Sequence, residues 1–378
     1  MRKIYAAAAL AVCAVLAIQS CRRTNVEKNP TIPYVRTILS SRSSAEMDIL
    51  RRSAGPSSRE DISLIAPQSF AEKFAERFVS YDVRDNVDGR LSPDGLADFA
   101  GETLFCVFDD SLGYAADDDA RTMLREKCVR LSLAALDTAL HISPYDIEGM
   151  GRKNSSKVLI LGSPLAAAYG MFDVDTLLRS TSCKVPVLSP IELSLEELFR
   201  SDKIKPGSLL NVGIVYDSLI VDKSTVEGIF NSYACANAHP GSTCFAIPAD
   251  SEPEFVRRMV HSYVDGGHGG ALDAIIVDDI GTDVEALKNE VAGLVSVMNE
   301  SSMTYSRYFS EDLLIVDSFE QTLSRVYVIL REGNQFTHNI SMPLVENCFP
   351  APAPDSDDGS LILVSASYVQ NQHIAGGN

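Results

Sequence analysis

The chain has no tryptophan and only six histidines among its 378 residues. The lack of tryptophan argues against a sugar site built on a large stacking ring, although phenylalanine and tyrosine remain for that role. The histidines are scattered, without the spacing that metal ligands show in sequence. The sequence therefore predicts no metal site and no bound cofactor.

Sequence motifs of common enzymes are also missing. The chain has no GxSxG, no glycine-lysine phosphate loop and no HExxH. The glycine-rich stretch 266–270 precedes an apolar run, which is the wrong order for a loop that cradles phosphate. We expect a protein that is not an enzyme, while noting that carboxylates from distant loops can meet in a folded site.

Basic residues are fewer than acidic ones, 33 against 51, which gives a formal net charge of −18. Such a chain repels phosphate backbones, so nucleic acid is not expected as a partner. No cysteine lies in a CxxC pair, and we expect at most one disulfide. Cys235 and Cys244 are close enough in sequence to form it.

The first 21 residues carry the only long apolar run. Arg2 and Lys3 precede it, and it ends at Ile18-Gln19-Ser20-Cys21, an order typical of an export signal. With about 15 apolar residues it is short for a membrane span. Its end resembles the lipobox of bacterial lipoproteins, with Gln19 as a departure from the family pattern. That resemblance implies a signal peptide over 1–21 and a lipid on Cys21 that attaches the protein to a membrane.

Residues 22–58 are polar, with three prolines and no sustained period. They are predicted to form a flexible tether, within which Ala45–Arg52 is a candidate for a short helix. Arg22 and Arg23 follow Cys21, where the surface-export signal of Bacteroidetes lipoproteins would have acidic residues. We therefore expect a lipid-anchored protein of the cell envelope that faces the periplasm.

From residue 59 onward, short apolar runs alternate with amphipathic stretches. Phe70, Phe74 and Phe78 are four residues apart, which predicts a helix over 69–81, and Ser69 followed by Glu72 matches a capping box at its start. Strands are predicted at 62–66, 103–108, 157–162, 185–190, 209–216, 244–247, 271–277, 313–316 and 361–364. Further helices are predicted at 120–140, 223–236, 252–264, 283–298 and 319–330. Such alternation is typical of an α/β fold with parallel sheets and helices on both faces.

The runs Val212-Gly213-Ile214-Val215-Tyr216-Asp217 and 272–279 resemble strands of the type I periplasmic solute-binding fold, as does Val185-Pro186-Val187-Leu188. The resemblance implies two α/β lobes, 59–200 and 207–345, with a returning tail over 346–378. It also implies a ligand cleft between the lobes.

Parallel sheets place ligands at the carboxyl ends of their strands. The candidate ligand-binding residues at these ends are Gln68, Ser69, Phe70, Asp109, Asp110, Ser163, Tyr216, Asp217, Asp250, Asp278 and Asp279. Their hydroxyl and carboxylate groups suit a polyol, a nucleoside or an amine.

The resulting hypothesis is a lipid-anchored envelope protein that binds a small polar solute for transport or sensing, together with a transporter or sensor partner. Two alternatives stay open. One is a structural or assembly lipoprotein with a similar, non-catalytic fold, and the other is a hydrolase of envelope substrates.

Overall fold

A computed structural model describes residues 31–41, 43–86, 89–113, 117–145, 150–250, 252–301, 308–337, 339, 341–353 and 359–367. The predicted signal peptide and Cys21 lie outside these residues. None of the helices within the described ranges is long and apolar enough to cross a membrane.

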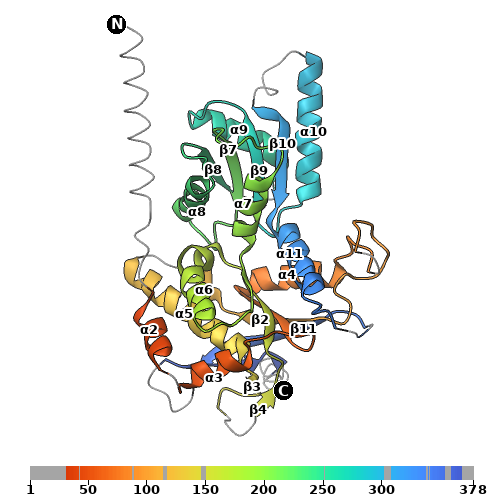
Figure 1. Cartoon of the computed structure of the whole chain (residues 1–378). Helices are drawn as coiled ribbons and strands as arrows, with labels where there is room; N and C mark the ends of the chain where they lie inside the picture. The colour runs from red at the N-terminus through yellow and green to blue at the C-terminus, as the bar shows by residue number, and fades with distance from the viewer. Residues whose placement is uncertain are drawn as a thin grey trace, which may run out of the picture. The chain divides into compact units, whose positions relative to one another are not determined.

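The chain divides into two compact units. Figure 1 shows them with the chain coloured by residue number. The first unit comprises 31–193, 219–221 and the described residues from 319 on. The second unit comprises 194–218 and 222–318. The predicted lobes differ from these units at their ends, because the chain after Ser318 belongs to the first unit.

An eight-stranded sheet forms the centre of the first unit, in the order β4-β3-β12-β11-β2-β1-β5-β6. Its inner strands β11, β2, β1 and β5 run parallel, and antiparallel pairs occur at β11–β12 and β3–β4. The bounds of the strands are β1 Asp61–Ala66, β2 Thr103–Phe108, β3 Ala139–His141, β4 Met150–Arg152, β5 Ser156–Leu161, β6 Val187–Leu188, β11 Leu344–Pro352 and β12 Leu361–Ser365. The predicted tail over 346–378 thus supplies most of β11 and all of β12.

Two inner strands of this sheet, β1 and β5, are buried on both sides. Both are buried at every position, as expected where helices cover both faces. Ring contacts join two helices, α4 (Gln68–Ser80) and α11 (Ser318–Glu332): the Phe70 and Phe319 centroids are 5.2 Å apart. The other helices of this unit are η1 (Asp110–Gly113), α5 (Asp118–Leu136), η2 (Ala166–Gly170) and α6 (Met171–Ser180). α7 (Pro190–Arg200) begins in the first unit and ends in the second.

The prediction of a flexible tether over 22–58 is wrong for its described part. Two helices form there, α2 (Pro33–Ser40) and α3 (Ala45–Arg52). Val35 and Leu50 are fully buried, and α2 contacts α6 while α3 contacts α5. Burial of these apolar side chains against the rest of the unit stabilises the two helices, although the segment is polar in overall composition.

The second unit is built on a four-stranded, fully parallel sheet in the order β10-β9-β7-β8. The bounds are β7 Asn211–Tyr216, β8 Thr243–Pro248, β9 Leu272–Asp278 and β10 Phe309–Asp317. Its helices are α8 (Lys223–Ala236), α9 (Phe255–Asp265) and α10 (Val284–Ser301).

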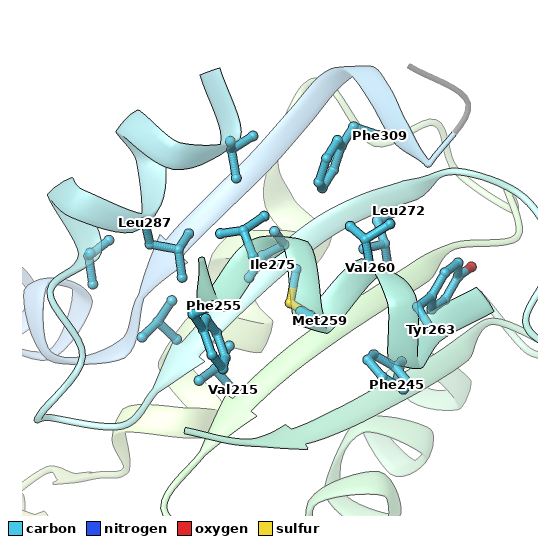
Figure 2. Packing of buried hydrophobic residues seen from close by; sticks show 14 residues of the cluster. Val215, Phe245, Phe255, Met259, Val260, Tyr263, Leu272, Ile275, Leu287 and Phe309 are labelled. Carbon is cyan, nitrogen blue, oxygen red and sulfur yellow. The ribbon is translucent and has the colours of Figure 1, made fainter. Parts of the chain in front are cut away.

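Figure 2 shows the core on one face of this sheet, where α9 and α10 pack. Met259 and Val260 of α9 lie against Val215 and Ile275 of the strands, with Leu287 from α10 beside them. Side chains alternate along a strand, so the equally buried Ile214, Ala274 and Ile276 point to the opposite face. Figure 1 shows α8 on the side of the sheet away from α10. The predicted α/β class, with parallel sheets and helices on both faces, is therefore confirmed.

Candidate functional site

Three strands of the first unit end side by side, and the loops that follow them converge. The backbone N–H of Asp109, after β2, donates to Ala66 O at 2.9 Å, and that of Gly162, after β5, donates to Ile65 O at 2.9 Å. These bonds tie the ends of β2 and β5 to the end of β1. The residues that follow the three strands are therefore neighbours at one edge of the sheet.

Asp110 joins the loop after β2 to the start of α4. Its Oδ1 accepts a hydrogen bond of 2.9 Å from the backbone N–H of Gln68, the first residue of the helix. Pro67 precedes the helix and has no side-chain oxygen to cap it. Asp110 thus supplies the cap from 42 residues away, and its charge favours the positive end of the helix.

A pocket of about 420 Å³ opens beside this contact. Its polar lining consists of Gln68, Ser69, Glu72 and Asp110, and the Gln68 Nε2 donates to Glu72 Oε1 at 2.8 Å. The remaining lining residues are Pro67, Gly113, Leu219 and Ile220. The last two follow β7 in the chain but belong to the first unit. Among the described residues that line it, the pocket therefore presents two carboxylates and no basic side chain.

Asp109 lies behind this pocket in a closed network. Its Oδ1 accepts from the Ser111 hydroxyl at 2.7 Å, and its Oδ2 lies 2.7 Å from Lys127 Nζ. Lys127 Nζ also donates to Ser111 Oγ at 2.6 Å. Because Asp109 is buried and already bound by these groups, it supports η1 rather than facing the pocket.

A second cavity, of about 470 Å³, lies on the other side of η1. Ser111 and Lys127 line it, together with Met123, Leu124 and other residues of α5 and the β12 region. The short helix η1 thus lies between two cavities, with Asp110 and Gly113 lining one and Ser111 lining the other.

Two candidates in the first unit serve the core. Phe70 is buried between the rings of Phe74 and Phe319 and is not available for stacking on a ligand. Ser163 is fully buried, and its hydroxyl donates to Leu112 O at 2.7 Å. This bond holds η1 to the end of β5. Both residues stand at the predicted edge, but their side chains point into the protein.

The five candidates of the second unit lie at or near the carboxyl edge of its own sheet. Tyr216 and Asp278 are register partners on β7 and β9, and both are buried. Asp279 accepts from Thr282 Oγ1 at 2.7 Å. Asp250 forms an ion pair with Arg258, and Asp217 directly follows β7. Asp250, Asp279 and Tyr216 are therefore explained by local structure.

Asp278 differs from the other candidates in its environment. Burial raises the pKa of its carboxyl group to about 8, and the neighbouring Asp279 and Asp317 add to this. A hydrogen bond with Ser318 acts in the opposite direction. Asp278 is thus a buried carboxylic acid that is mainly neutral at pH 7.

Sequence reasoning identified three of the eight residues that line the pocket and missed the other five. Glu72 lies one helical turn after Gln68, so the periodicity of the predicted helix could have identified it. Leu219 and Ile220 had no such signal, because they reach the pocket from a loop that follows a strand of the other unit.

The cysteines in the described part of the chain form no disulfide. All six, including Cys235 and Cys244, are thiols, which agrees with the expected limit of one bridge, although Cys235 and Cys244 are not joined. Burial raises the pKa of Cys106 and of Cys128 to about 12, the opposite of what a nucleophilic thiolate requires. Within the same residues, no group of three His, Cys, Asp or Glu side chains is arranged to hold a metal ion.

No protein-family model matches this chain, and no curated protein matches it in sequence. Solved structures with a similar fold include three bacterial glutamate racemases. The enzyme from Francisella tularensis, in complex with D-glutamate, is 12% identical, with a TM-score of 0.47 over 77% of this chain and 88% of that one. The RacE1 isoform from Bacillus anthracis is 12% identical, with a TM-score of 0.45 over the same shares of the two chains. The enzyme from Campylobacter jejuni is 13% identical, with a TM-score of 0.39 over 83% of this chain and 97% of that one.

The expectation that the protein is not an enzyme is corrected by these matches, because the similar structures are those of enzymes. The missing sequence motifs thus do not exclude a reaction. A fold of this kind positions its functional groups on loops from distant parts of the chain, where a short motif does not reveal them.

Proposed function

We propose that the first unit binds a small polar ligand in the pocket between the loops that follow β1 and β2. The observation that carries the proposal is the convergence of Gln68, Ser69 and Asp110 with Glu72 around one pocket of about 420 Å³. That volume lies within the range of about 300–1,000 Å³ usual for small-molecule sites. The carboxyl edge of a parallel sheet is also where such folds bind ligands.

The lining favours a ligand rich in hydrogen-bond donors. Asp110 and Glu72 supply carboxylate oxygens, and Ser69 adds a hydroxyl group. Because no lysine or arginine lines the pocket, an anionic ligand would meet like charge without compensation. Amines, polyols and nucleosides are the classes that fit.

The ligand class is tested by a thermal-shift screen of the full chain with polyamines, polyols, nucleosides and amino acids. A ligand at about 100 times its dissociation constant stabilises the folded state by about 2.7 kcal/mol. We expect an amine or a polyhydroxyl compound to raise Tm. If no compound class changes Tm, the proposal is wrong.

Two substitutions assign any binding to this pocket. Glu72→Gln removes a lining charge and is expected to weaken an amine by about tenfold, the effect of about 1.4 kcal/mol. Glu76→Gln, one turn further along the exposed side of α4, removes the same charge outside the pocket and should leave affinity unchanged. Equal effects of the two substitutions would place the ligand elsewhere.

We further propose that the protein is attached to the cell envelope by lipid on Cys21, faces the periplasm and delivers its ligand to a transporter or sensor. The export-signal pattern of residues 1–21 supports this role. The division into two α/β units supports a resemblance to periplasmic solute-binding proteins. Labelling of cells with a lipid precursor should mark the wild-type protein and not the Cys21→Ala variant. Label on the variant would refute the anchor.

A further inference from the structure

The carboxyl group of Asp278 is buried at the end of β9 without full hydrogen bonding. The residue is 7% exposed, and its Oδ1 has no hydrogen-bond partner among the described residues. A buried polar atom left in this state costs free energy. Such a group needs an explanation beyond packing.

Asp278 is the inner end of a chain of buried side chains. It is hydrogen-bonded to Ser318, the first residue of α11. The Ser318 hydroxyl in turn accepts from Ser194 Oγ of α7 at 2.8 Å, and both serines are fully buried. These hydrogen bonds therefore join the end of β9 to α7 and α11. Each of these two helices lies only partly in the second unit.

The backbone first enters the second unit at Ser194 and finally leaves it after Ser318, with a short departure over 219–221 between them. The division of the chain falls between Leu193 and Ser194 and again between Ser318 and Phe319. Their hydrogen bond thus links two crossings of the backbone that are 124 residues apart in sequence. Asp278 is therefore connected through these hydrogen bonds to both positions, Ser194 and Ser318, where the backbone crosses between the units.

The surroundings of Asp278 contain no compensating positive charge among the groups that act on it. The charged groups are Asp279, next in the chain, and Asp317, at the end of β10. β7 contributes Tyr216, whose own pKa is raised by burial. From α11, Ser318 is hydrogen-bonded to Asp278, and from α7, Ser194 is hydrogen-bonded to Ser318; both side chains are uncharged. Because burial and both acids disfavour the carboxylate, the pKa of Asp278 is raised to about 8, and a change from pH 6.5 to pH 9 ionises it.

We propose that Asp278 is a proton switch at the two crossings. As a neutral acid it completes the hydrogen-bonded chain to Ser318 and Ser194. Its ionisation places a buried charge there that only one donor satisfies. The helix turns around Ser194 and Ser318 then open locally to let water reach the carboxylate. This inference does not depend on the pocket proposed above.

Hydrogen exchange of the full chain at pH 6.5 and pH 9 tests the switch, after correction for intrinsic rates. Peptides over 190–200 and 318–325 should open more often at pH 9, by up to about thirtyfold, since the opening constant rises about tenfold for each unit up to the pKa. In Asp278→Asn, which cannot ionise, protection should be the same at both pH values. Equal protection of the wild type at both values, or a response that persists in Asp278→Asn, would overturn the proposal.

Asp279→Asn is the matched control, because it removes an equal charge from the adjacent position. It should keep the pH response and move its midpoint to lower pH, since the Asp279 carboxylate raises the pKa of Asp278. A second measurement covers the case in which Asp278→Asn fails to fold. In wild-type protein labelled with ¹³C at aspartate carboxyls, one aspartate should titrate above pH 7. If none does, the switch does not exist.

Discussion

Gly162 occupies the most crowded point of the strand ends around the pocket. A Cβ atom at this position would lie 2.7 Å from Phe70 Cε1 and 2.8 Å from Ala66 Cβ. Real Cβ atoms do not approach so closely, so an added methyl group must displace the start of α4 or the end of β1. The fit of η1, α4 and β5 at this edge thus depends on a missing side chain.

Gly162→Ala is expected to destabilise the protein by about 1–3 kcal/mol, the usual cost of overpacking, and to weaken ligand binding at the adjacent pocket. Urea unfolding measures the first effect. Gly228→Ala is the control, because a Cβ at Gly228 in α8 meets nothing within 4 Å; there, helix propensity predicts a gain of up to about 1 kcal/mol. A smaller cost at Gly162 than at Gly228 would contradict this packing.

Lys157 and Glu102 form a fully buried ion pair in the first unit. Lys157 Nζ lies 2.5 Å from Glu102 Oε2 and donates to Gln335 O at 2.9 Å, while Glu102 Oε1 accepts from the Thr337 backbone at 2.7 Å. The pair therefore fastens the segment after α11 to the sheet. Burial raises the pKa of Glu102 despite the ammonium beside it.

Lys157→Met is expected to cost about 3–5 kcal/mol, because it leaves the Glu102 carboxylate buried without its partner. The double variant Lys157→Met with Glu102→Leu should cost less than the single one, since it removes both buried charges. Lys288→Met breaks an exposed pair with Glu285 and should cost less than about 1 kcal/mol. Urea unfolding midpoints of the three variants measure these costs. A double variant less stable than Lys157→Met would contradict the explanation that the cost comes from an unpaired buried charge.

Individual side chains show how far the sequence identifies a site. Gln68, Ser69 and Asp110 were predicted from their place after apolar strands, and all three line the pocket. Phe70 and Ser163 were predicted by the same rule, yet both are buried in the core. Position after a strand locates the edge of the sheet, but the direction of each side chain depends on what packs around it.

Some helices of this protein are easier to predict from the sequence than others. α4 was predicted from phenylalanines four apart, and Phe70, Phe74 and Phe78 are all buried as that spacing requires. Its start was predicted as a capping box of Ser69 and Glu72, whereas Asp110 caps it from the next loop. α2 was missed, because an eight-residue helix is marginal alone and gains stability only from the surface it covers, whereas 45–52 was a helix candidate and forms α3.

Asp173 fastens α2 to the rest of the first unit. Its carboxylate is fully buried, accepts from Arg125 Nε at 2.6 Å and from Nη2 at 3.1 Å, and also accepts from the backbone N–H of Ile32 at 3.1 Å. Ile32 is the residue directly before α2. The same carboxylate thus binds α5 and the start of α2 from its position in α6.

Asp173→Ala is expected to release α2, because it leaves the Arg125 guanidinium without its carboxylate and the Ile32 N–H without its acceptor. A cost of about 3–5 kcal/mol is typical when one partner of such a pair is removed. Hydrogen exchange over residues 33–40 should accelerate more than over α4. Asp175→Ala, which breaks an exposed pair with Arg179, should leave α2 protected. If α2 exchanges equally in both variants, Asp173 does not hold it.

The molecule as a whole is divided in a way that the order of its elements does not suggest. Successive strands and helices suggested one lobe after another along the chain. The structure instead returns the backbone to the first unit for residues 219–221 and again from Phe319 onward. β11 then pairs with β2, a strand about 240 residues earlier in the chain. The first unit therefore contains both the first described residues of the chain and the last ones, which add β11 and β12 to its sheet.

Three carboxyl groups and one lysine make the stability of the whole protein depend on pH. Burial raises the pKa of Asp61 and of Asp98 to about 6 and that of Asp278 to about 8, and it lowers the pKa of Lys153 to about 8. Between about pH 4 and pH 8 the folded state holds more protons on these acids than the unfolded state, so stability falls as pH rises. Above about pH 8 the lowered pKa of Lys153 favours the folded state, but the raised pKa values of the Cys106 and Cys128 thiols act in the opposite direction, because the unfolded state loses those protons first.

We therefore expect stability to fall between pH 6 and pH 8, with a slope of about −1.4 kcal/mol per unit from Asp278 alone. Tm measured from pH 5 to pH 8 reveals the fall. Asp278→Asn should flatten the descent from pH 6 to pH 8. A wild-type Tm that increases steadily from pH 5 to pH 8 would contradict this assignment.

The sequence by itself determined the α/β class, the inner strands other than β11 and the edge where polar side chains gather, because hydrophobic period and strand-end position are local properties. Only the tertiary structure decided which of those side chains face a pocket, that Asp110 rather than Ser69 caps α4, that β11 joins the sheet and that α2 is folded. It also decided that Leu219 and Ile220 complete the pocket lining. These outcomes depend on contacts between residues far apart in the chain, and the free energy of such contacts arises only once both partners are in place.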